Sequence, residues 1–211
     1  MRVCGVDEAG RGPVIGPLVV AGVATDDPES IRELGVKDSK VLSPVRREGL
    51  AIRIKERADV AVRLVQPWEI DRLRETQTMN EMECGVFADI IGSMNVEVAY
   101  VDAVDVDAGR FADDISKLLE TKVRIVSEHK ADSTYPIVSA ASIVAKVRRD
   151  MEIENIKVEL GYDFGSGYPS DPKTVEAVKR MVDRGKISKY VRRSWDTFKR
   201  LSVKGLDRWQ R

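Results

Sequence analysis

The beginning of the chain places side chains that could bind a metal close to a turn that could bind phosphate. A short apolar run leads into two adjacent acids, Asp7 and Glu8, and the turn Gly10-Arg11-Gly12 follows after one alanine. Carboxylates at a strand end can hold a divalent cation, and a glycine turn offers backbone N–H groups to an anion. The pattern predicts a metal site beside a polyanion site; the alternative is an exposed acidic turn after an edge strand.

Two further acids follow predicted strands. Asp102 directly follows the apolar run 98–101, and Asp132 comes after the run 123–126, ahead of the longest predicted helix. If these strands are neighbours, the carboxylates converge and raise each other's pKa, and a bound cation is the usual relief. Oxygen ligands suit Mg²⁺ or Mn²⁺, and two such ions would activate a water and stabilise the leaving oxygen in phosphodiester cleavage. The alternative for both acids is a turn or cap role, which we expect of Asp107.

Glu8 raises a geometric question, because successive side chains of a strand point to opposite faces. Asp7 and Glu8 therefore cannot both project into one site from a regular strand. Either the strand breaks at Glu8 or Glu8 contributes its backbone carbonyl, and both interpretations stay open. His129 is the only histidine; it could shuttle protons, but we assign it no role.

The composition is that of a globular protein with a highly charged surface. The 211 residues are 43% apolar and 33% charged, which is enough for a substantial core. No apolar run is long enough to cross a membrane, and the N-terminus lacks a signal-peptide pattern, so we expect a cytoplasmic protein without a membrane partner. Cys4 and Cys84 form no metal-binding pattern, and we expect both to be reduced.

The formal net charge of zero hides a basic C-terminal segment. Residues 179–211 hold many more lysines and arginines than acids, together with Tyr190, Trp195, Phe198 and Trp209. Basic and aromatic side chains in one segment are typical of a nucleic-acid-binding face. The alternative is an ordinary helical surface whose aromatic side chains pack inward.

Hydrophobic periodicity and capping residues predict the elements that must position these side chains. Strands are expected at 3–7, 18–24, 59–66, 97–102 and 122–127, and the first two form a hairpin. Helices are expected at 44–57, 67–73, 78–93, 107–119, 136–160, 171–185 and 194–201, with Ser43 and Thr78 as N-caps. An antiparallel start followed by strand–helix alternation predicts an α/β fold with a mixed five-stranded sheet flanked by helices.

Several motifs, in order along the chain, resemble those of the ribonuclease HII family, and the last resembles its archaeal form. They are Asp7-Glu8-Ala9-Gly10-Arg11-Gly12-Pro13, Asp38-Ser39-Lys40, Tyr100-Val101-Asp102, the block 127–132 with its continuation 135–142 and Ala145-Lys146, the block 165–171, and Arg193-Ser194-Trp195. Each motif alone would be weak, but together they are specific. The related HIII class normally carries an N-terminal extension and a different turn after its acids, so we expect the HII class here.

The resemblance implies a ribonuclease H-like catalytic domain over residues 1–160 and a helical substrate-binding appendage over residues 161–211. It implies endonucleolytic cleavage of the RNA strand of RNA–DNA hybrids, leaving 5′-phosphate and 3′-hydroxyl ends, by two Mg²⁺ or Mn²⁺ ions. It also implies incision of duplex DNA at single embedded ribonucleotides, as in ribonucleotide excision repair. We expect a monomer.

Carried over position by position, the resemblance assigns roles to ten residues. It implies that Asp7, Glu8, Asp102 and Asp132 bind metal and act in catalysis, and that Gly10, Arg11 and Gly12 read the ribose 2′-hydroxyl and adjacent phosphates. It implies that Tyr168 stacks on the deoxyribose after the ribonucleotide, and that Lys40 and Lys146 contact phosphate.

Two other functions stay open from the residues alone. One is a different nuclease of the same fold, such as a Holliday-junction resolvase or a transposase-like enzyme. The other is a non-catalytic nucleic-acid-binding module that uses the basic segment. Acids beside phosphate only weaken the binding of a polyanion unless they have another purpose, so the four acids favour a nuclease.

Overall fold

A computed structural model describes residues 1–36 and 42–206 of the chain. The chain divides into two compact units, each of which is assembled from several segments of the sequence. Unit 1 comprises Met1–Ala9, Val19–Leu64 and Thr78–Arg148; unit 2 comprises Gly10–Leu18, Val65–Gln77 and Arg149–Arg211. The two domains expected from the sequence, residues 1–160 and 161–211, stay a prediction.

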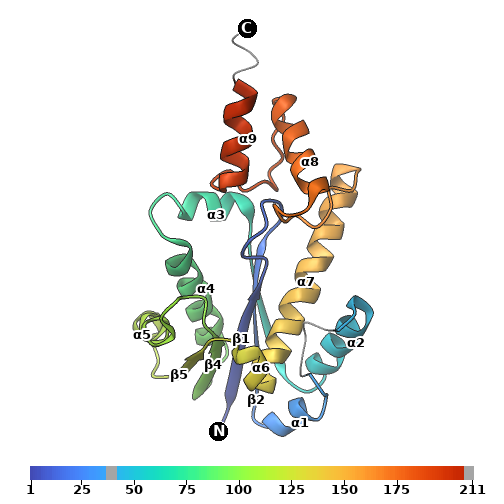
Figure 1. The fold of residues 1–211 in the computed structure, drawn as a ribbon. Coiled ribbons are helices and arrows are strands. Elements are labelled where there is room, and N and C mark those ends of the chain that lie inside the picture. Colours follow the sequence, from blue (N-terminus) through green and yellow to red (C-terminus); the bar gives the residue numbers. More distant parts are fainter. Residues whose placement is uncertain (37–41, 207–211) are drawn as a thin grey trace. The chain divides into compact units, whose positions relative to one another are not determined.

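Unit 1 is built on a mixed five-stranded sheet, as expected from the sequence (Figure 1). Its strands are β1 (Val3–Ala9), β2 (Leu18–Thr25), β3 (Asp59–Val65), β4 (Val98–Asp102) and β5 (Arg124–Glu128), in the order β3-β2-β1-β4-β5. Strand β1 pairs antiparallel with β2 and parallel with β4, and β4 pairs parallel with β5. The central position of β1 means that its end lies between neighbouring strand ends.

Helices cover both faces of this sheet. On one face lie α2 (Pro44–Lys55) and the first part of α7 (Pro136–Leu160), and α7 packs so closely on β1 that a side chain at Gly5 would collide with the backbone of Ile137. On the other face lie α4 (Met79–Ser93) and α5 (Ala108–Leu118), with Gly22 of β2 against Ile90 and Met94. Ser43 caps α2, Thr78 and Glu81 form a capping box on α4, and Asp107 caps α5, as expected.

Two short helices of unit 1 were not expected from the sequence. Helix α1 (Pro28–Arg32) begins with the usual signals, because the Asp27 side chain caps it and Pro28 occupies its first turn. Helix α6 (Ala131–Thr134) has no such signal, since its N-cap Lys130 makes no side-chain capping bond and has a positive φ of 59°. Helix α6 matters because it carries Asp132.

Unit 2 contains α3 (Pro67–Leu73), the remainder of α7, α8 (Pro172–Asp183) and α9 (Asp196–Leu206). Helices α8 and α9 lie side by side (Figure 1).

The aromatic side chains of Tyr190, Trp195 and Phe198 pack against the buried apolar cluster of unit 2. These three side chains pack inward, as the alternative expects of them, and whether the segment binds nucleic acid stays a prediction; Trp209 lies outside the described residues. The buried cluster comprises Val14, Ile15, Ile153, Ile156, Phe164, Ala177, Val178, Met181 and Val191.

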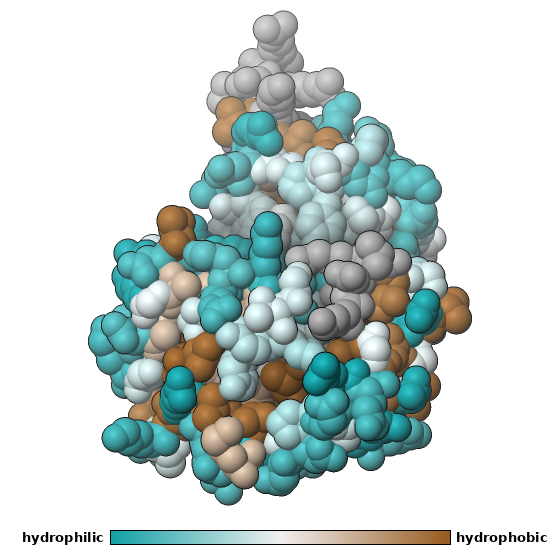
Figure 2. All heavy atoms as spheres, turned by 60° about the horizontal axis from the view of Figure 1, so that its bottom comes forward, coloured by the Kyte–Doolittle hydropathy of each residue, from teal (hydrophilic) through white to brown (hydrophobic). Residues whose placement is uncertain are grey.

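The visible surface is mainly hydrophilic. Figure 2 shows apolar residues interspersed among polar ones on the face that lies at the bottom of Figure 1. Of the large exposed apolar side chains, Val45 and Ile52 both lie on α2, about two turns apart, and Val106 lies in the loop before α5. Among the described residues, no helix combines the length and apolar character that crossing a membrane requires.

Candidate functional site

Three of the predicted acids meet at the end of the sheet in unit 1. The parallel register pairs Val6 of β1 with Val101 of β4, so the next residues, Asp7 and Asp102, lie side by side. Asp132 reaches the same place from α6, directly after β5. One carboxylate oxygen from each of Asp7, Asp102 and Asp132 lies within 4.8 Å of the others. The predicted convergence of these strand ends is therefore what the structure shows.

Hydrogen bonds hold the carboxylates of Asp102 and Asp7 in this arrangement. The N–H of Ala131 donates to Asp102 Oδ1 at 3.1 Å, which ties the start of α6 to the end of β4. Ser142, on the first part of α7, hydrogen-bonds to the Asp7 carboxylate, and Lys146 Nζ donates to Ser142 Oγ at 2.9 Å. Lys146, predicted to contact phosphate, is thus linked to Asp7 through a single hydroxyl.

The electrostatics of this cluster favour a bound cation. Burial, followed by the repulsion of Asp102, raises the pKa of Asp7 to about 8, although the Ser142 hydrogen bond opposes the shift. A divalent cation would offset both causes by compensating the buried negative charge. Because all three donors are carboxylate oxygens, the residues fit Mg²⁺ or Mn²⁺ better than zinc.

Glu8 is not among the clustered acids of the described residues. Strand β1 does not break at Glu8, since its antiparallel pairing continues to Ala9 opposite Val19. Asp7 lies on the α7 face of the sheet, so the half-buried Glu8 side chain points toward the opposite face. A regular strand leaves the Glu8 backbone carbonyl as the atom that could serve this site.

The neighbouring acids and the histidine have other surroundings. Asp105 accepts hydrogen bonds from the Asp107 N–H, Asn80 and Arg110, which hold its pKa at about 2. Asp107 caps α5, as the sequence indicates. His129 is exposed, with its Nε2 atom 3.1 Å from the carbonyl oxygen of Val106. Asp105 and Asp107 therefore have roles outside the carboxylate cluster, to which Asp102 belongs.

The glycine turn belongs to unit 2, and the backbone requires glycine at only one of its two glycine positions. Gly10 has a φ of 91°, and a Cβ there would lie 2.7 Å from the carbonyl oxygen of Pro17, so the backbone itself requires glycine. Gly12 is exposed and has no positive φ, and a Cβ there would make only ordinary contact, 3.5 Å from the Tyr168 ring. The fold therefore does not explain Gly12, and a close approach by a ligand would.

Tyr168 lies beside this turn, and Arg149 supports it. The guanidinium carbon of Arg149 is 4.9 Å from the centre of the Tyr168 ring, and Nη2 donates to the Ser166 carbonyl at 2.5 Å. The Val14 N–H donates to the Gly167 carbonyl at 2.8 Å, which connects the two loops. The structure thus brings Tyr168 and the Gly10-Arg11-Gly12 turn together within unit 2.

Two residues that hold the turn were not predicted to do so. Arg192 donates to the carbonyls of Gly10 and Arg11, and Trp195 donates to that of Gly12. Nothing in the sequence distinguishes the buried Arg192 from its exposed neighbour Arg193. The sequence also gave no reason to single out Arg149, because it is one of several basic residues on a long helix. Lys40, the remaining predicted site residue, lies outside the described residues.

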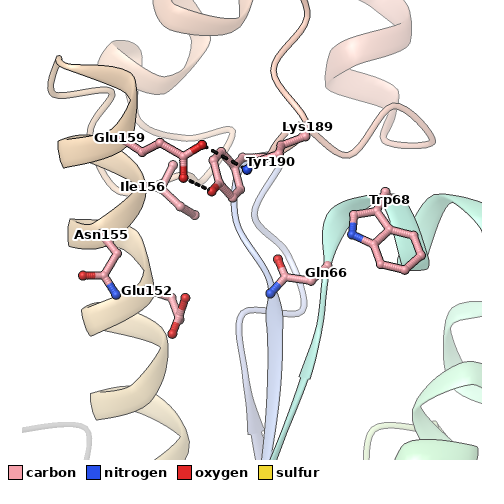
Figure 3. Close-up of a pocket in the computed structure, with 8 residues that line it drawn as sticks. All are labelled: Gln66, Trp68, Glu152, Asn155, Ile156, Glu159, Lys189 and Tyr190. Carbon is pink, nitrogen blue, oxygen red and sulfur yellow. Dashed lines mark hydrogen bonds and ion pairs between the residues drawn. The ribbon is translucent and has the colours of Figure 1, made fainter.

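A hollow elsewhere in unit 2 has a different chemistry. It has a volume of about 280 Å³ and is lined by Gln66, Trp68, Glu152, Asn155, Ile156, Glu159, Lys189 and Tyr190 (Figure 3). Glu159 accepts hydrogen bonds from the Tyr190 hydroxyl and from Lys189 Nζ, the latter at 3.0 Å. With two carboxylates and one ammonium group, this hollow does not fit a nucleic-acid backbone.

Comparisons with known proteins relate nearly the whole chain to one family. The model of the family described as Ribonuclease HII matches residues 4–198. The chain is 48% identical to a ribonuclease HII of Archaeoglobus fulgidus over 96% of its own length and 98% of the relative's. It is 49% identical to a ribonuclease HII of Pyrococcus furiosus, over 95% of its own length and 91% of the relative's.

Solved structures agree with the sequence comparisons. The crystal structure of ribonuclease H2 from Pyrococcus horikoshii matches with a TM-score of 0.91 at 45% identity, covering 98% of this chain and 99% of that one. Ribonuclease HII of Archaeoglobus fulgidus, solved in a complex with PCNA, matches with a TM-score of 0.88 at 47% identity, covering 93% and 96%. A ribonuclease HIII in complex with Mn²⁺ matches with a TM-score of 0.82 at 24% identity, covering 97% and 70%, a likeness of fold alone.

Proposed function

The chain belongs to the ribonuclease HII family and acts as a ribonuclease H on RNA–DNA, and from this premise we propose two finer properties. The first is cleavage by two divalent cations that leaves 5′-phosphate and 3′-hydroxyl ends. The second is incision of duplex DNA at single embedded ribonucleotides. The observation that carries the proposal is the group of three carboxylate oxygens, from Asp7, Asp102 and Asp132, within 4.8 Å of one another.

Each residue of the metal site has a distinct part in the proposed reaction. Asp7, whose buried carboxylate has the raised pKa, would hold Mg²⁺ or Mn²⁺ together with Asp102 and Asp132. Bound ions would supply an activated water and stabilise the leaving oxygen of the phosphodiester. Glu8 would contribute its backbone carbonyl, and Ser142 would hold the Asp7 carboxylate in place.

The choice of substrate would belong to the turn and the tyrosine. Telling RNA from DNA at one nucleotide requires a contact with the 2′-hydroxyl, which both donates and accepts hydrogen bonds. Backbone groups of Gly10-Arg11-Gly12 can approach a ribose because Gly12 is exposed and carries no side chain. Tyr168, 36% exposed, presents a ring on which the following sugar can stack. Lys40 and Lys146 would contact phosphate.

A three-substrate cleavage assay tests this proposal. The substrates are an RNA–DNA hybrid, a DNA duplex with one embedded ribonucleotide, and a branched DNA, each with Mg²⁺ or Mn²⁺. We expect metal-dependent cleavage of the first two, with the product ends identified by labelling, and none of the branched DNA. Cleavage of the branched DNA would favour a resolvase-like enzyme. Metal-independent binding of all three without turnover would favour a binding module.

A further inference from the structure

The loop that begins with the turn, residues 10–18 of unit 2, is tied to a buried charge. Arg192 is the largest fully buried side chain of the described residues. Its Nη2, Nη1 and Nε atoms donate to the carbonyl oxygens of Gly10, Arg11 and Gly16 at 2.6, 2.9 and 2.9 Å. A guanidinium is buried at a large cost unless its donors are paired, so these carbonyls must point at Arg192 in the folded state.

Trp195 extends the same support to the next carbonyl of the turn. Its indole Nε1 donates to the carbonyl oxygen of Gly12 at 3.1 Å. Its ring also lies 4.7 Å from the guanidinium carbon of Arg192, a cation–π contact that holds the two side chains together. Three consecutive carbonyls, from Gly10 to Gly12, are therefore held by one pair of side chains.

Because the carbonyls of Gly10 and Arg11 are held toward Arg192, the geometry of the peptide bond also fixes the direction of the N–H groups in the same two peptides. In a trans peptide the N–H of one residue points away from the carbonyl of the residue before it, and the described residues include no cis bond. The N–H groups of Arg11 and Gly12 therefore point away from Arg192. Pro13, after the third held carbonyl, has no N–H to direct.

We propose that Arg192, supported by Trp195, is the positioning residue that aims the N–H groups of Arg11 and Gly12 at the ribose and its phosphate. Arginine stays protonated at any working pH, so a fixed positive charge lies behind the two peptide groups. Hydrogen bonds that share a peptide group polarise one another, which makes these N–H groups better donors to an oxygen atom. Donors held in place before the substrate arrives cost no reorganisation when it binds.

This inference rests on the proposed recognition of the 2′-hydroxyl. Its test measures how well the protein distinguishes a duplex with one ribonucleotide from the same duplex made entirely of DNA. In an Asp7→Asn background, which prevents cleavage, affinity is measured for a DNA duplex with one ribonucleotide and for the same duplex entirely of DNA. We expect Arg192→Lys, which cannot fork across three carbonyls, to lower the ratio of these affinities roughly tenfold to a hundredfold. Affinity for the all-DNA duplex should change less than about threefold, since most backbone contacts remain.

Two further variants separate positioning from mere stability. Trp195→Phe keeps an aromatic ring against the guanidinium but removes the donor to Gly12, and should lower the same ratio by a smaller factor. Phe198→Leu weakens the packing of the same buried cluster without touching the turn, so it should lose stability and keep the ratio. If Arg192→Lys does not fold, Trp195→Phe decides the question.

The possible failures are distinguishable from one another. If the parent protein binds both duplexes equally and does not incise the embedded ribonucleotide, the proposed function fails. If the parent discriminates but Arg192→Lys and Trp195→Phe keep its ratio, or Phe198→Leu lowers the ratio as much as they do, the positioning role of Arg192 is wrong.

Discussion

Replacing Asp7 by asparagine should stabilise the protein when no divalent cation is present. The carboxyl of Asp7 has a pKa of about 8 in the fold against 3.8 in the unfolded chain. For an acid whose folded pKa is raised, the unfolded state releases its proton first, so the metal-free fold loses stability as the pH rises from about 4 to about 8. An asparagine side chain cannot ionise, so Asp7→Asn removes this loss.

The size of the effect follows from the separation of the two pKa values. The folded and unfolded pKa values of Asp7 lie about 4 units apart. At about 1.4 kcal/mol for each pKa unit, this difference costs the metal-free fold about 5 kcal/mol of stability by pH 8. The asparagine amide still needs partners beside Ser142 and Asp102, so much of the gain from removing the carboxyl is lost again. We expect Asp7→Asn to be more stable than the parent by about 1–3 kcal/mol at pH 8 and by almost nothing at pH 4.

Urea denaturation in EDTA at several pH values between 4 and 8 measures this difference directly. Asp89→Asn, a change at an exposed acid of α4, is the matched control and should leave stability unchanged at every pH. Saturating Mn²⁺ should reverse the order, because a cation at a hundred times its Kd stabilises the parent by about 3 kcal/mol. Asp7→Asn should also abolish cleavage while hybrid binding persists. An Asp7→Asn protein no more stable than the parent at pH 8 in EDTA would refute this reasoning.

The remaining predictions concern the turn, the tyrosine and the thiols. Gly12→Ala should change the unfolding free energy by less than about 1 kcal/mol yet lower incision at an embedded ribonucleotide at least tenfold, whereas Gly10→Ala should cost roughly 2–4 kcal/mol; equal stability losses would contradict the distinction. Tyr168→Ala should weaken incision at a single ribonucleotide more than cleavage of a long hybrid, and equal losses would remove its junction-reading role. Burial raises the pKa of Cys4 to about 12 and that of Cys84 to about 11, so neither should react with a thiol reagent at pH 8 until urea unfolds the protein; rapid reaction of the folded protein would be the contrary result.

The sequence predicted helix caps and helix starts correctly where neighbouring residues alone determine them. The caps Ser43, Thr78 and Asp107 were predicted because a side-chain oxygen satisfies a backbone N–H two or three residues away. Helix α3 and helix α7 have the predicted bounds, since proline marks the start of each. Helix α1 carried the same kind of signal, in Asp27 and Pro28, and could have been found.

The sequence by itself also named the three acids that the structure brings together, Asp7, Asp102 and Asp132. Motifs spread over the chain identified the family, and the oxygen-only donor set indicated the kind of metal. The sequence raised the question of Glu8, because side-chain alternation is a local property of strands. It could not answer the question, since the answer depends on β1 remaining paired with β2 through Ala9.

Only the tertiary structure decided which distant residues act together. The meeting of Asp7 with Asp102 depends on β1 pairing with β4, nearly a hundred residues later in the chain. The burial of Arg192 and the exposure of Arg193 depend on which side of one segment faces the loop 10–18, and the two residues are identical in type. Pairing between distant segments is set by the packing of the whole core, so no local pattern in the sequence records it.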